Sequence, residues 1–233
     1  MSAGEETASA PGAGVDPRHI LIIGAGPGLG AAVARRFARE RFRVTLAGRR
    51  EEPLAALATE LRASGATVDT VLADAGDQPA FRGRLQAWAQ TDAPGVVVYN
   101  AALVTRDIIL NADTEYLQAA FSVDVLGAVA AAQVFTPAMV GAGAGTFLTT
   151  GGGPGLHAEP AHATLSIGKA ALRAVTSMLH DELAPKNVHA SIVTVAGDIA
   201  AGTAFAPDRI AEVYWRLHRQ PASEWRWETV FEG

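Results

Sequence analysis

A glycine-dense turn near the start of the chain limits the possible folds more than any other feature of the sequence. Residues 19–37 read HILIIGAGPGLGAAVARRF, so an apolar run leads into the turn and an alanine-rich helical segment follows it. A buried strand, a tight turn and a helix N-terminus form a phosphate-binding arrangement, because unpaired backbone N–H groups and the positive end of the helix dipole converge there. We therefore predict a dinucleotide site held by the turn at Gly24, Gly28, Leu29 and Gly30.

Length and composition fit one α/β domain. The 233 residues are enough for a substantial core, and 49% hydrophobic residues with a mean hydropathy of +0.16 suit a parallel sheet covered on both faces. The segment 1–17 is rich in Ala, Gly, Ser and Pro, so we expect a disordered leader there and a single domain at 18–233.

Charge and composition exclude several classes of protein. A net charge of −5 and a pI of about 5.7 give no electrostatic reason to expect nucleic acid or an anionic membrane as a partner. The N-terminus lacks the pattern of a secretory signal, and no apolar run approaches the ~20 residues that span a bilayer. The chain has no Cys, and its His and carboxylate residues lack metal-ligand spacing. We expect a soluble, cytoplasmic protein without a bound metal.

Apolar runs alternate with helical segments along the chain. The runs at 20–23, 42–47, 67–72, 96–99, 146–150, 188–195 and 225–231 are the expected strands. Helices are expected at 28–40, 51–64, around Phe81–Leu85–Trp88, and at 113–140, 161–183 and 207–218. Strand–helix alternation with short connections predicts a Rossmann-type, doubly wound parallel sheet of about seven strands in the order 3-2-1-4-5-6-7.

Four features of the sequence carry a family resemblance. The turn GAGPGLG has the spacing GxxxGxG, Asp74 ends the third expected strand, Asn100-Ala101-Ala102 follows the fourth, and Lys169 lies on the second long helix. In this pattern the chain resembles the short-chain dehydrogenase/reductase (SDR) family from about Arg18 to Val195. The resemblance implies that Asp74 contacts the adenine, that Asn100 and Ala101 line the cofactor site, and that Lys169 binds the nicotinamide ribose.

The end of the second expected strand indicates the cofactor. Enzymes that use NAD usually place a carboxylate there to accept hydrogen bonds from the ribose hydroxyls. Here that position is Gly48, followed by Arg49 and Arg50. A guanidinium group suits a phosphate dianion, so these arginines favour NADP(H) over NAD(H).

The catalytic positions depart from the family pattern. Lys169 is present, but Leu165 stands where the resemblance implies the acid/base tyrosine, Gly152 replaces the serine, and Asp124 replaces the asparagine. Leucine cannot transfer a proton and glycine cannot orient a carbonyl group, so the usual mechanism is not available. The chain, with its tryptophan-rich tail, resembles a divergent SDR subgroup that lacks the Ser/Tyr pair.

Three side chains are candidates for a substitute proton donor. His157 and His162 lie in the loop before the second long helix, and histidine titrates in the useful pH range. Asp124 is an acid near the expected pocket. Each has a plainer interpretation, since loop histidines are usually solvated and Asp124 could keep only a helix contact. Tyr99 and the other four histidines are interpreted as structural.

Three functions remain open at this point. The first is an NADP(H)-dependent oxidoreductase that reduces an activated C=O, C=N or C=C group of a small-molecule substrate without a tyrosine acid. The second is a non-redox isomerase, cyclase or dehydratase, and the third is a dinucleotide-binding pseudoenzyme. In each case the resemblance implies a homodimer or homotetramer, formed through the helices at 113–140 and 161–183.

Overall fold

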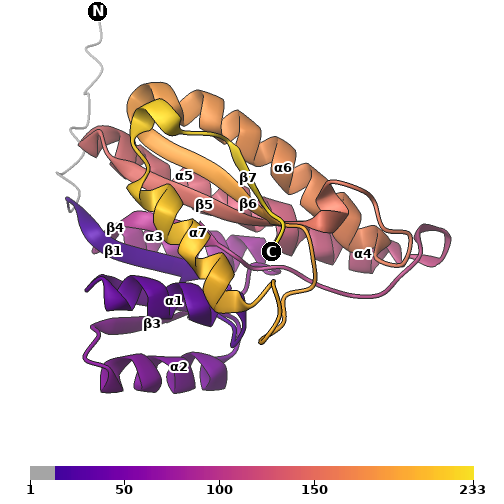
Figure 1. The fold of residues 1–233 in the computed structure, drawn as a ribbon, viewed down its shortest axis with the longest axis horizontal. Helices are drawn as coiled ribbons and strands as arrows, with labels where there is room; N and C mark the ends of the chain where they lie inside the picture. Colours follow the sequence, from indigo (N-terminus) through magenta and orange to yellow (C-terminus); the bar gives the residue numbers. More distant parts are fainter. Residues whose placement is uncertain (1–13) are drawn as a thin grey trace, which may run out of the picture.

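A computed structural model describes residues 14–233 as helices packed around one parallel sheet (Figure 1). The sheet has the order β3-β2-β1-β4-β5-β6-β7, and every neighbouring pair is parallel. The strands are β1 (Val15–Ile23), β2 (Arg43–Gly48), β3 (Val68–Leu72), β4 (Ala93–Tyr99), β5 (Gly145–Gly152), β6 (Val188–Val195) and β7 (Glu228–Phe231). This architecture confirms the predicted fold class and strand order.

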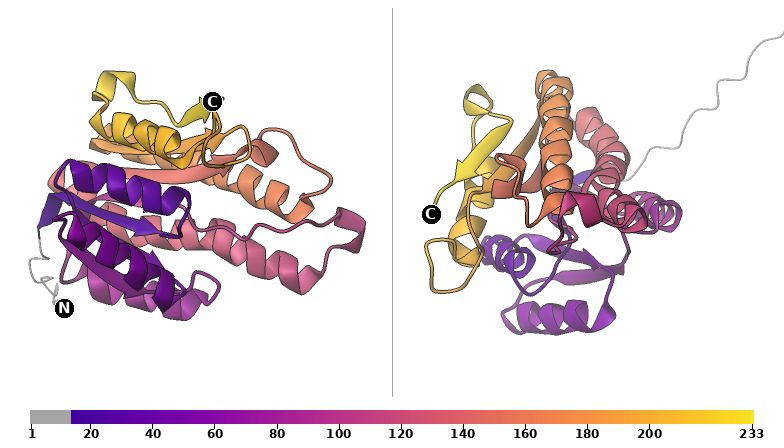
Figure 2. Two further views of the ribbon diagram at one scale, coloured as in Figure 1. Left: turned by 60° about the horizontal axis from the view of Figure 1, so that its bottom comes forward. Right: turned by 90° about the vertical axis from the view of Figure 1, so that its right-hand side faces the viewer.

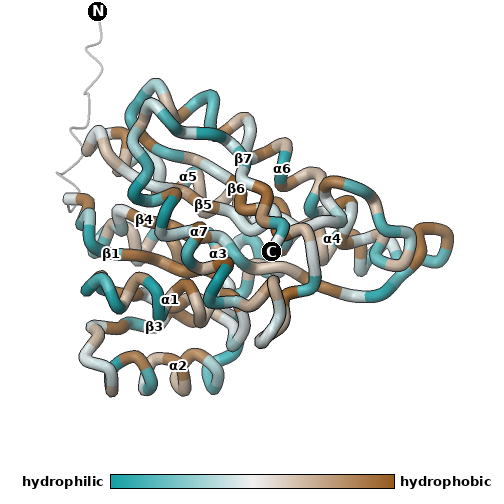
Figure 3. Tube along the Cα trace, viewed as in Figure 1, coloured by the Kyte–Doolittle hydropathy of each residue, from teal (hydrophilic) through white to brown (hydrophobic). Residues whose placement is uncertain are grey.

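Helices cover both faces of the sheet (Figure 2). One core contains residues of α1 (Leu29–Arg39), α2 (Glu51–Ala63) and α7 (Pro207–Arg219), packed on one face of the sheet. The other core contains residues of α3 (Gln78–Ala89), α5 (Gly127–Ala142) and α6 (Ala163–Leu183). Hydrophobic residues are concentrated in the central strand β1, where Ile20, Leu21 and Ile22 are fully buried (Figure 3). Burial on both faces explains why this strand is a continuous apolar run.

The first strand begins earlier than the sequence suggested. It starts at Val15, which pairs with Ala93, and Asp16 pairs with Pro94. We expected the ordered chain to begin near Arg18, which is three residues after the observed start of the strand. The segment 14–18 reads GVDPR, and its proline and charged residues hide a strand whose partner is far away in the sequence. The rest of the expected leader, residues 1–13, lies outside the described part of the chain.

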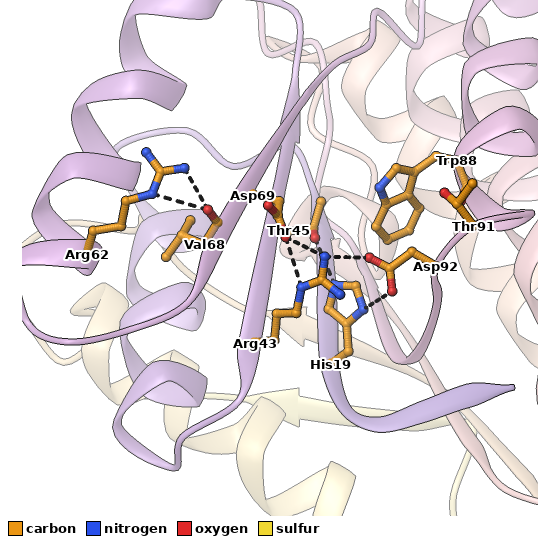
Figure 4. Close-up of polar contacts among 9 residues, drawn as sticks. All are labelled: His19, Arg43, Thr45, Arg62, Val68, Asp69, Trp88, Thr91 and Asp92. Carbon is orange, nitrogen blue, oxygen red and sulfur yellow. Dashed lines mark hydrogen bonds and ion pairs between the residues drawn. The ribbon is translucent and has the colours of Figure 1, made fainter. Parts of the chain in front are cut away.

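A network of polar side chains lies at the end of the sheet where β1 and β2 begin (Figure 4). The buried His19 lies 2.8 Å from Thr45 Oγ1 through Nε2 and 3.2 Å from Asp92 Oδ1 through Nδ1. Arg43 pairs with Asp69 at 2.6 Å and with Asp92 at 2.8 Å. Burial lowers the pKa of His19, against the opposing effect of Asp92. These contacts join β1, β2, β3 and the start of β4, so His19 is structural, as predicted.

The first long helix is interrupted, contrary to the expectation of one continuous helix at 113–140. It consists of α4 (Thr114–Phe121), a π-helical turn at Ser122–Leu126 and α5. A π-helical turn holds one extra residue per turn, and such turns frequently occur at functional sites. Helical periodicity over a long window does not reveal a single inserted residue.

The same stretch, Thr114–Ala142, is long and apolar enough to cross a membrane by length and composition alone. The most apolar 18-residue window of this stretch has a mean hydropathy of 1.6. The expectation that no apolar stretch is long enough to span a bilayer was therefore too strict. Half of that window is buried inside the protein, and α5 packs against α3 and the sheet. A core helix meets the same criteria, and its apolar residues here form part of the core.

The last strand is shorter than expected. It covers Glu228–Phe231, and the tryptophans at 225 and 227 precede it. Trp225 stacks on His189 with ring centroids 4.8 Å apart, and the guanidinium group of Arg173 lies 5.3 Å from the Trp227 ring. The alternation at 225–231 therefore reflects aromatic packing in its first half and sheet pairing in its second.

Candidate functional site

Two glycines of the turn allow close approach between elements, and two face open space. Gly24 has φ +90°, and a Cβ there would lie 2.4 Å from Ala101 N. A Cβ on Gly30 would lie 2.5 Å from the carbonyl oxygen of Gly24. At Gly26 and Gly28, a Cβ would meet nothing within 4 Å. The first pair therefore lets β1, α1 and the end of β4 meet, and the second pair leaves the space that an anion would need.

Asn100 ties this turn to the end of β5. Its Nδ2 donates to the carbonyl oxygen of Gly24 at 2.9 Å, and its Oδ1 accepts from the Thr150 hydroxyl at 2.9 Å. The Thr150 hydroxyl also lies 2.7 Å from the hydroxyl of Tyr214, a fully buried residue of α7. Thr150 and Tyr214 were not predicted, because neither lies near the turn in the sequence.

A cleft of about 220 Å³ lies at the carboxyl ends of β1 to β4. It is lined by residues 23–26, 48–50, 53–54, 73–75, 100–103 and 123. The predicted residues Gly24, Arg49, Arg50, Asp74, Asn100 and Ala101 are therefore brought together at one cleft. Gly28, Leu29, Gly30 and Lys169 do not line it, and Gly26, Leu54 and Val123 are lining residues that the sequence did not reveal.

The arginines at the rim of this cleft are exposed to solvent, and their charges are not paired with an acidic side chain of the described residues. Arg49 and Arg50 follow Gly48 at the end of β2 and form no ion pair within residues 14–233. Asp74 also lines the cleft, after the end of β3, and its Oδ1 accepts a hydrogen bond from the Gly76 N–H at 2.9 Å. The end of β2 thus places Arg49 and Arg50 at the rim of the cleft.

Lys169 is buried at the end of β5. Its Nζ donates to the carbonyl oxygen of Thr150 at 2.8 Å, and burial lowers its pKa. Leu165, one turn earlier in α6, is also buried, and a Cβ added at Gly152 would meet nothing closer than Pro154 Cδ at 3.6 Å. A Cβ added at Gly152 would lie 4.0 Å from Cγ of Lys169, so the side chain of this lysine packs beside Gly152.

Asp124 is fully buried on the π-helical turn. Its Oδ1 accepts from the Leu103 N–H at 2.8 Å, and its Oδ2 has no hydrogen-bond partner among the described residues. Burial raises the pKa of Asp124, and the charge of Lys169 and the Leu103 N–H oppose that shift. The charge of each group therefore shifts the pKa of the other. Within the described residues, Lys169 Nζ does not come within 4.0 Å of a carboxylate oxygen of Asp124, so the two form no ion pair.

The two candidate histidines lie apart from this pair. His162 precedes α6, and its Nδ1 lies 3.1 Å from Glu159 Oε2 at the surface. His157 is exposed. Within residues 14–233, neither histidine has a hydrogen bond or ion pair to Asp124 or Lys169. Tyr99 is buried in the core and donates to the carbonyl oxygen of Val123, as its structural interpretation predicted.

No group of three or more His, Cys, Asp or Glu side chains in the described chain could hold a metal ion.

A glycine turn between β1 and α1, below a cleft at the point where strand order reverses, defines a doubly wound α/β protein of the dinucleotide-binding type. A family model described as short chain dehydrogenase matches residues 18–204. The chain therefore belongs to the short-chain dehydrogenase/reductase family of oxidoreductases, which confirms the resemblance.

Individual relatives agree with this assignment. The chain is 31% identical over 195 residues to an uncharacterized oxidoreductase of Mycobacterium tuberculosis, covering 80% of this chain and 74% of that protein. It is 31% identical over 183 residues to a dehydrogenase/reductase SDR family protein 7-like of Drosophila melanogaster, of which it spans 55%. A metagenomic short-chain oxidoreductase, solved in complex with NADP, superposes with a TM-score of 0.82 at 23% identity, covering 93% of this chain and 97% of that one.

Proposed function

We propose that this protein is an NADP(H)-dependent oxidoreductase that reduces an activated C=O, C=N or C=C group of a small molecule. The observation that carries the proposal is the pair of uncompensated arginines, Arg49 and Arg50, at the rim of the cleft. A carboxylate at the end of β2 would repel a 2′-phosphate, whereas guanidinium groups bind it. Solved structures similar to this chain include complexes with NADP and with NAD, which supports a nicotinamide dinucleotide in general.

The residues of this chain would bind the cofactor and supply the proton. The glycine turn would hold the pyrophosphate, Arg49 the 2′-phosphate and Asp74 the adenine. When bound, the nicotinamide supplies a hydride from its C4. Lys169 would contact the nicotinamide ribose, and the bare backbone at Gly152 would leave room for the substrate. The proton donors open to this site are Lys169, Asp124, His162 and His157, since Leu165 cannot donate.

Replacing the rim arginines tests the cofactor assignment. In the Arg49→Ala/Arg50→Ala protein, we expect the Kd for NADPH to rise by roughly 10- to 100-fold, because one charge-assisted hydrogen bond to the 2′-phosphate contributes about 1.5–3 kcal/mol. The Kd for NADH should change by less than about threefold, because NADH lacks the 2′-phosphate. Fluorescence titration of both cofactors measures this difference.

The exposed Arg84 on α3 provides a matched control, since Arg84→Ala removes an arginine far from the cleft. Equal weakening of NADPH and NADH in the double variant would contradict a 2′-phosphate site. Product formation by the wild type without NADPH consumption would instead favour the non-redox isomerase, cyclase or dehydratase.

We also propose a homodimer or homotetramer formed through α4, α5 and α6. Four large apolar side chains on these helices and on the π-helical turn between α4 and α5 are more than a third exposed, namely Phe121, Leu126, Ile167 and Met178. Exposed large apolar side chains that gather on one face commonly mark interfaces. Sedimentation velocity should give a mass of two or four times 24.1 kDa, and Ile167→Glu with Met178→Glu should reduce it to one chain. A wild-type mass of one chain would refute the assembly.

A further inference from the structure

One carboxylate, that of Glu228 on β7, joins the C-terminal segment to both α6 and β6. Its two oxygens accept hydrogen bonds from Arg173 of α6, at 2.7 Å from Nε and 2.6 Å from Nη2. Its Oε1 also accepts from the hydroxyl of Thr194 on β6 at 2.6 Å. Strand β7 runs beside β6, and α6 lies next to both (Figure 1). These contacts therefore attach the last strand to the helix that carries Lys169.

This ion pair differs from a pair at the surface, because solvent screens it little. The side chain of Glu228 is 12% exposed and that of Arg173 is 26% exposed. A guanidinium fork on a carboxylate also fixes the relative orientation of the two groups. The hydrogen bonds from Arg173 hold the pKa of Glu228 below its usual value, so the carboxylate is charged at neutral pH. Both side chains are thus held in one arrangement.

The two partners of this carboxylate contact opposite ends of the glycine run at 151–155. At the first end, a Cβ on Gly151 would lie 2.6 Å from Thr194 Oγ1, so this hydroxyl packs directly on the backbone. At the second end, Arg173 Nη1 donates to the carbonyl oxygen of Gly155 at 3.3 Å. The C-terminal strand therefore reaches both ends of the run through one carboxylate.

The centre of the run is open. A Cβ on Gly152 would lie 3.6 Å from its nearest neighbour, and one on Gly153 would lie 3.7 Å from its nearest neighbour. Thr150, directly before the run, donates to Asn100 Oδ1 at 2.9 Å, and Asn100 lines the cleft. Ligands of doubly wound sheets bind outside the carboxyl ends of the strands. A substrate beside the cofactor would therefore meet the bare backbone of Gly152 and Gly153.

A backbone of this kind needs contacts from outside to keep one shape. Glycine loses more conformational freedom on folding than any other residue, and the run GGGPG contains four glycines. Pairing with β6 ends at Gly152. Beyond that residue the chain forms the short 3₁₀ turn Gly153–Gly155, to which Arg173 donates. The shape of the run past β5 thus depends on how firmly Arg173 is held.

We propose that Arg173 and Glu228 are positioning residues for the substrate, because they hold the backbone of Gly152 and Gly153 in the shape that the substrate contacts. The proposal rests on the proposed function, and it makes the C-terminal strand a part of the substrate site. Neither residue lines the cleft at the carboxyl ends of β1 to β4, so binding of NADPH should not depend on them.

The first test needs neither cofactor nor turnover. Glu228→Gln keeps the shape of the side chain and removes its charge, so we expect the amide hydrogens of residues 151–157 to exchange about 10-fold faster, while those of β1 keep their rates. Exchange is measured by mass spectrometry on the full chain. Glu224→Gln, at an exposed carboxylate of the same tail, is the control and should change neither region. Unchanged exchange at 151–157 in Glu228→Gln would overturn the proposal.

The second test measures reduction of 2,3-butanedione, a small activated dicarbonyl compound, by NADPH. In Arg173→Met we expect the KM for 2,3-butanedione to rise about 10-fold while the Kd for NADPH stays within about twofold, because a displaced backbone misplaces the substrate alone. Arg226→Met, at an exposed arginine of the tail, should leave both constants unchanged. A wild-type KM in Arg173→Met would refute a role in substrate binding.

Reversing the charges separates positioning from stability. The Arg173→Glu/Glu228→Arg protein again has an ion pair between α6 and β7, so its thermal midpoint should exceed that of Arg173→Met. A carboxylate at position 173 cannot donate to the Gly155 carbonyl, so the KM should stay raised. A merely structural role would restore the KM together with the thermal midpoint. A wild type that binds no NADPH would refute the proposed function alone, since the exchange test does not require the cofactor.

Discussion

Gly24→Ala is expected to lower the free energy of unfolding by about 3 kcal/mol or more and to abolish measurable dinucleotide binding. A left-handed backbone costs a residue with a side chain about 1–2 kcal/mol, and overpacking adds about 1–3 kcal/mol. Here the added Cβ would lie 2.4 Å from the backbone nitrogen of Ala101, which cannot move without displacing the end of β4. Urea unfolding and NADPH titration measure the two effects.

Gly26→Ala is the control from the same turn. A Cβ there meets nothing within 4 Å, so the free energy of unfolding should change by less than about 0.5 kcal/mol. If both substitutions were equally tolerated, the close packing of Gly24 against Ala101 would not exist in solution.

The protein should also lose much of its stability between pH 6.5 and pH 4. Burial lowers the pKa of His189 and of His218 to about 4, and the proximity of His189 lowers that of His218 further. In this window the unfolded chain binds more protons than the folded one, so the free energy of unfolding falls as the pH falls. Each histidine should remove about 2 kcal/mol by pH 5, when its pKa is 6.5 unfolded and about 4 folded.

Denaturant unfolding at pH 7.5, 6.5, 5.5 and 4.5 measures this loss. His218→Gln should flatten the profile, because glutamine does not titrate, although it also disturbs the contact with Thr146 Oγ1 at 3.0 Å. His157→Gln, at an exposed position, should leave the slope unchanged. A wild-type stability that is constant from pH 7 to pH 5 would show that these histidines are not buried in solution.

Sequence reasoning was most successful where the signal is local. The apolar run before GAGPGLG, the helix that follows it and the strand at 188–195 are set by periodicity and turn chemistry within a few residues, and the structure confirms them. It failed at Val15, whose pairing with Ala93 leaves no local pattern, and at the π-helical turn, where one inserted residue barely changes the helical period.

The sequence by itself determined the family, the sheet order and part of the cleft lining, namely Gly24, Arg49, Arg50, Asp74, Asn100 and Ala101, because strand–helix alternation permits few topologies and places every strand end at the same edge. Only the tertiary structure decided that Gly24 and Gly30 serve close packing while Gly26 and Gly28 face open space. It also brought the carboxylate of Asp124 against Gly168 beside the buried Lys169. These outcomes depend on how closely segments far apart in the chain approach each other, and that distance is set by the packing of whole elements.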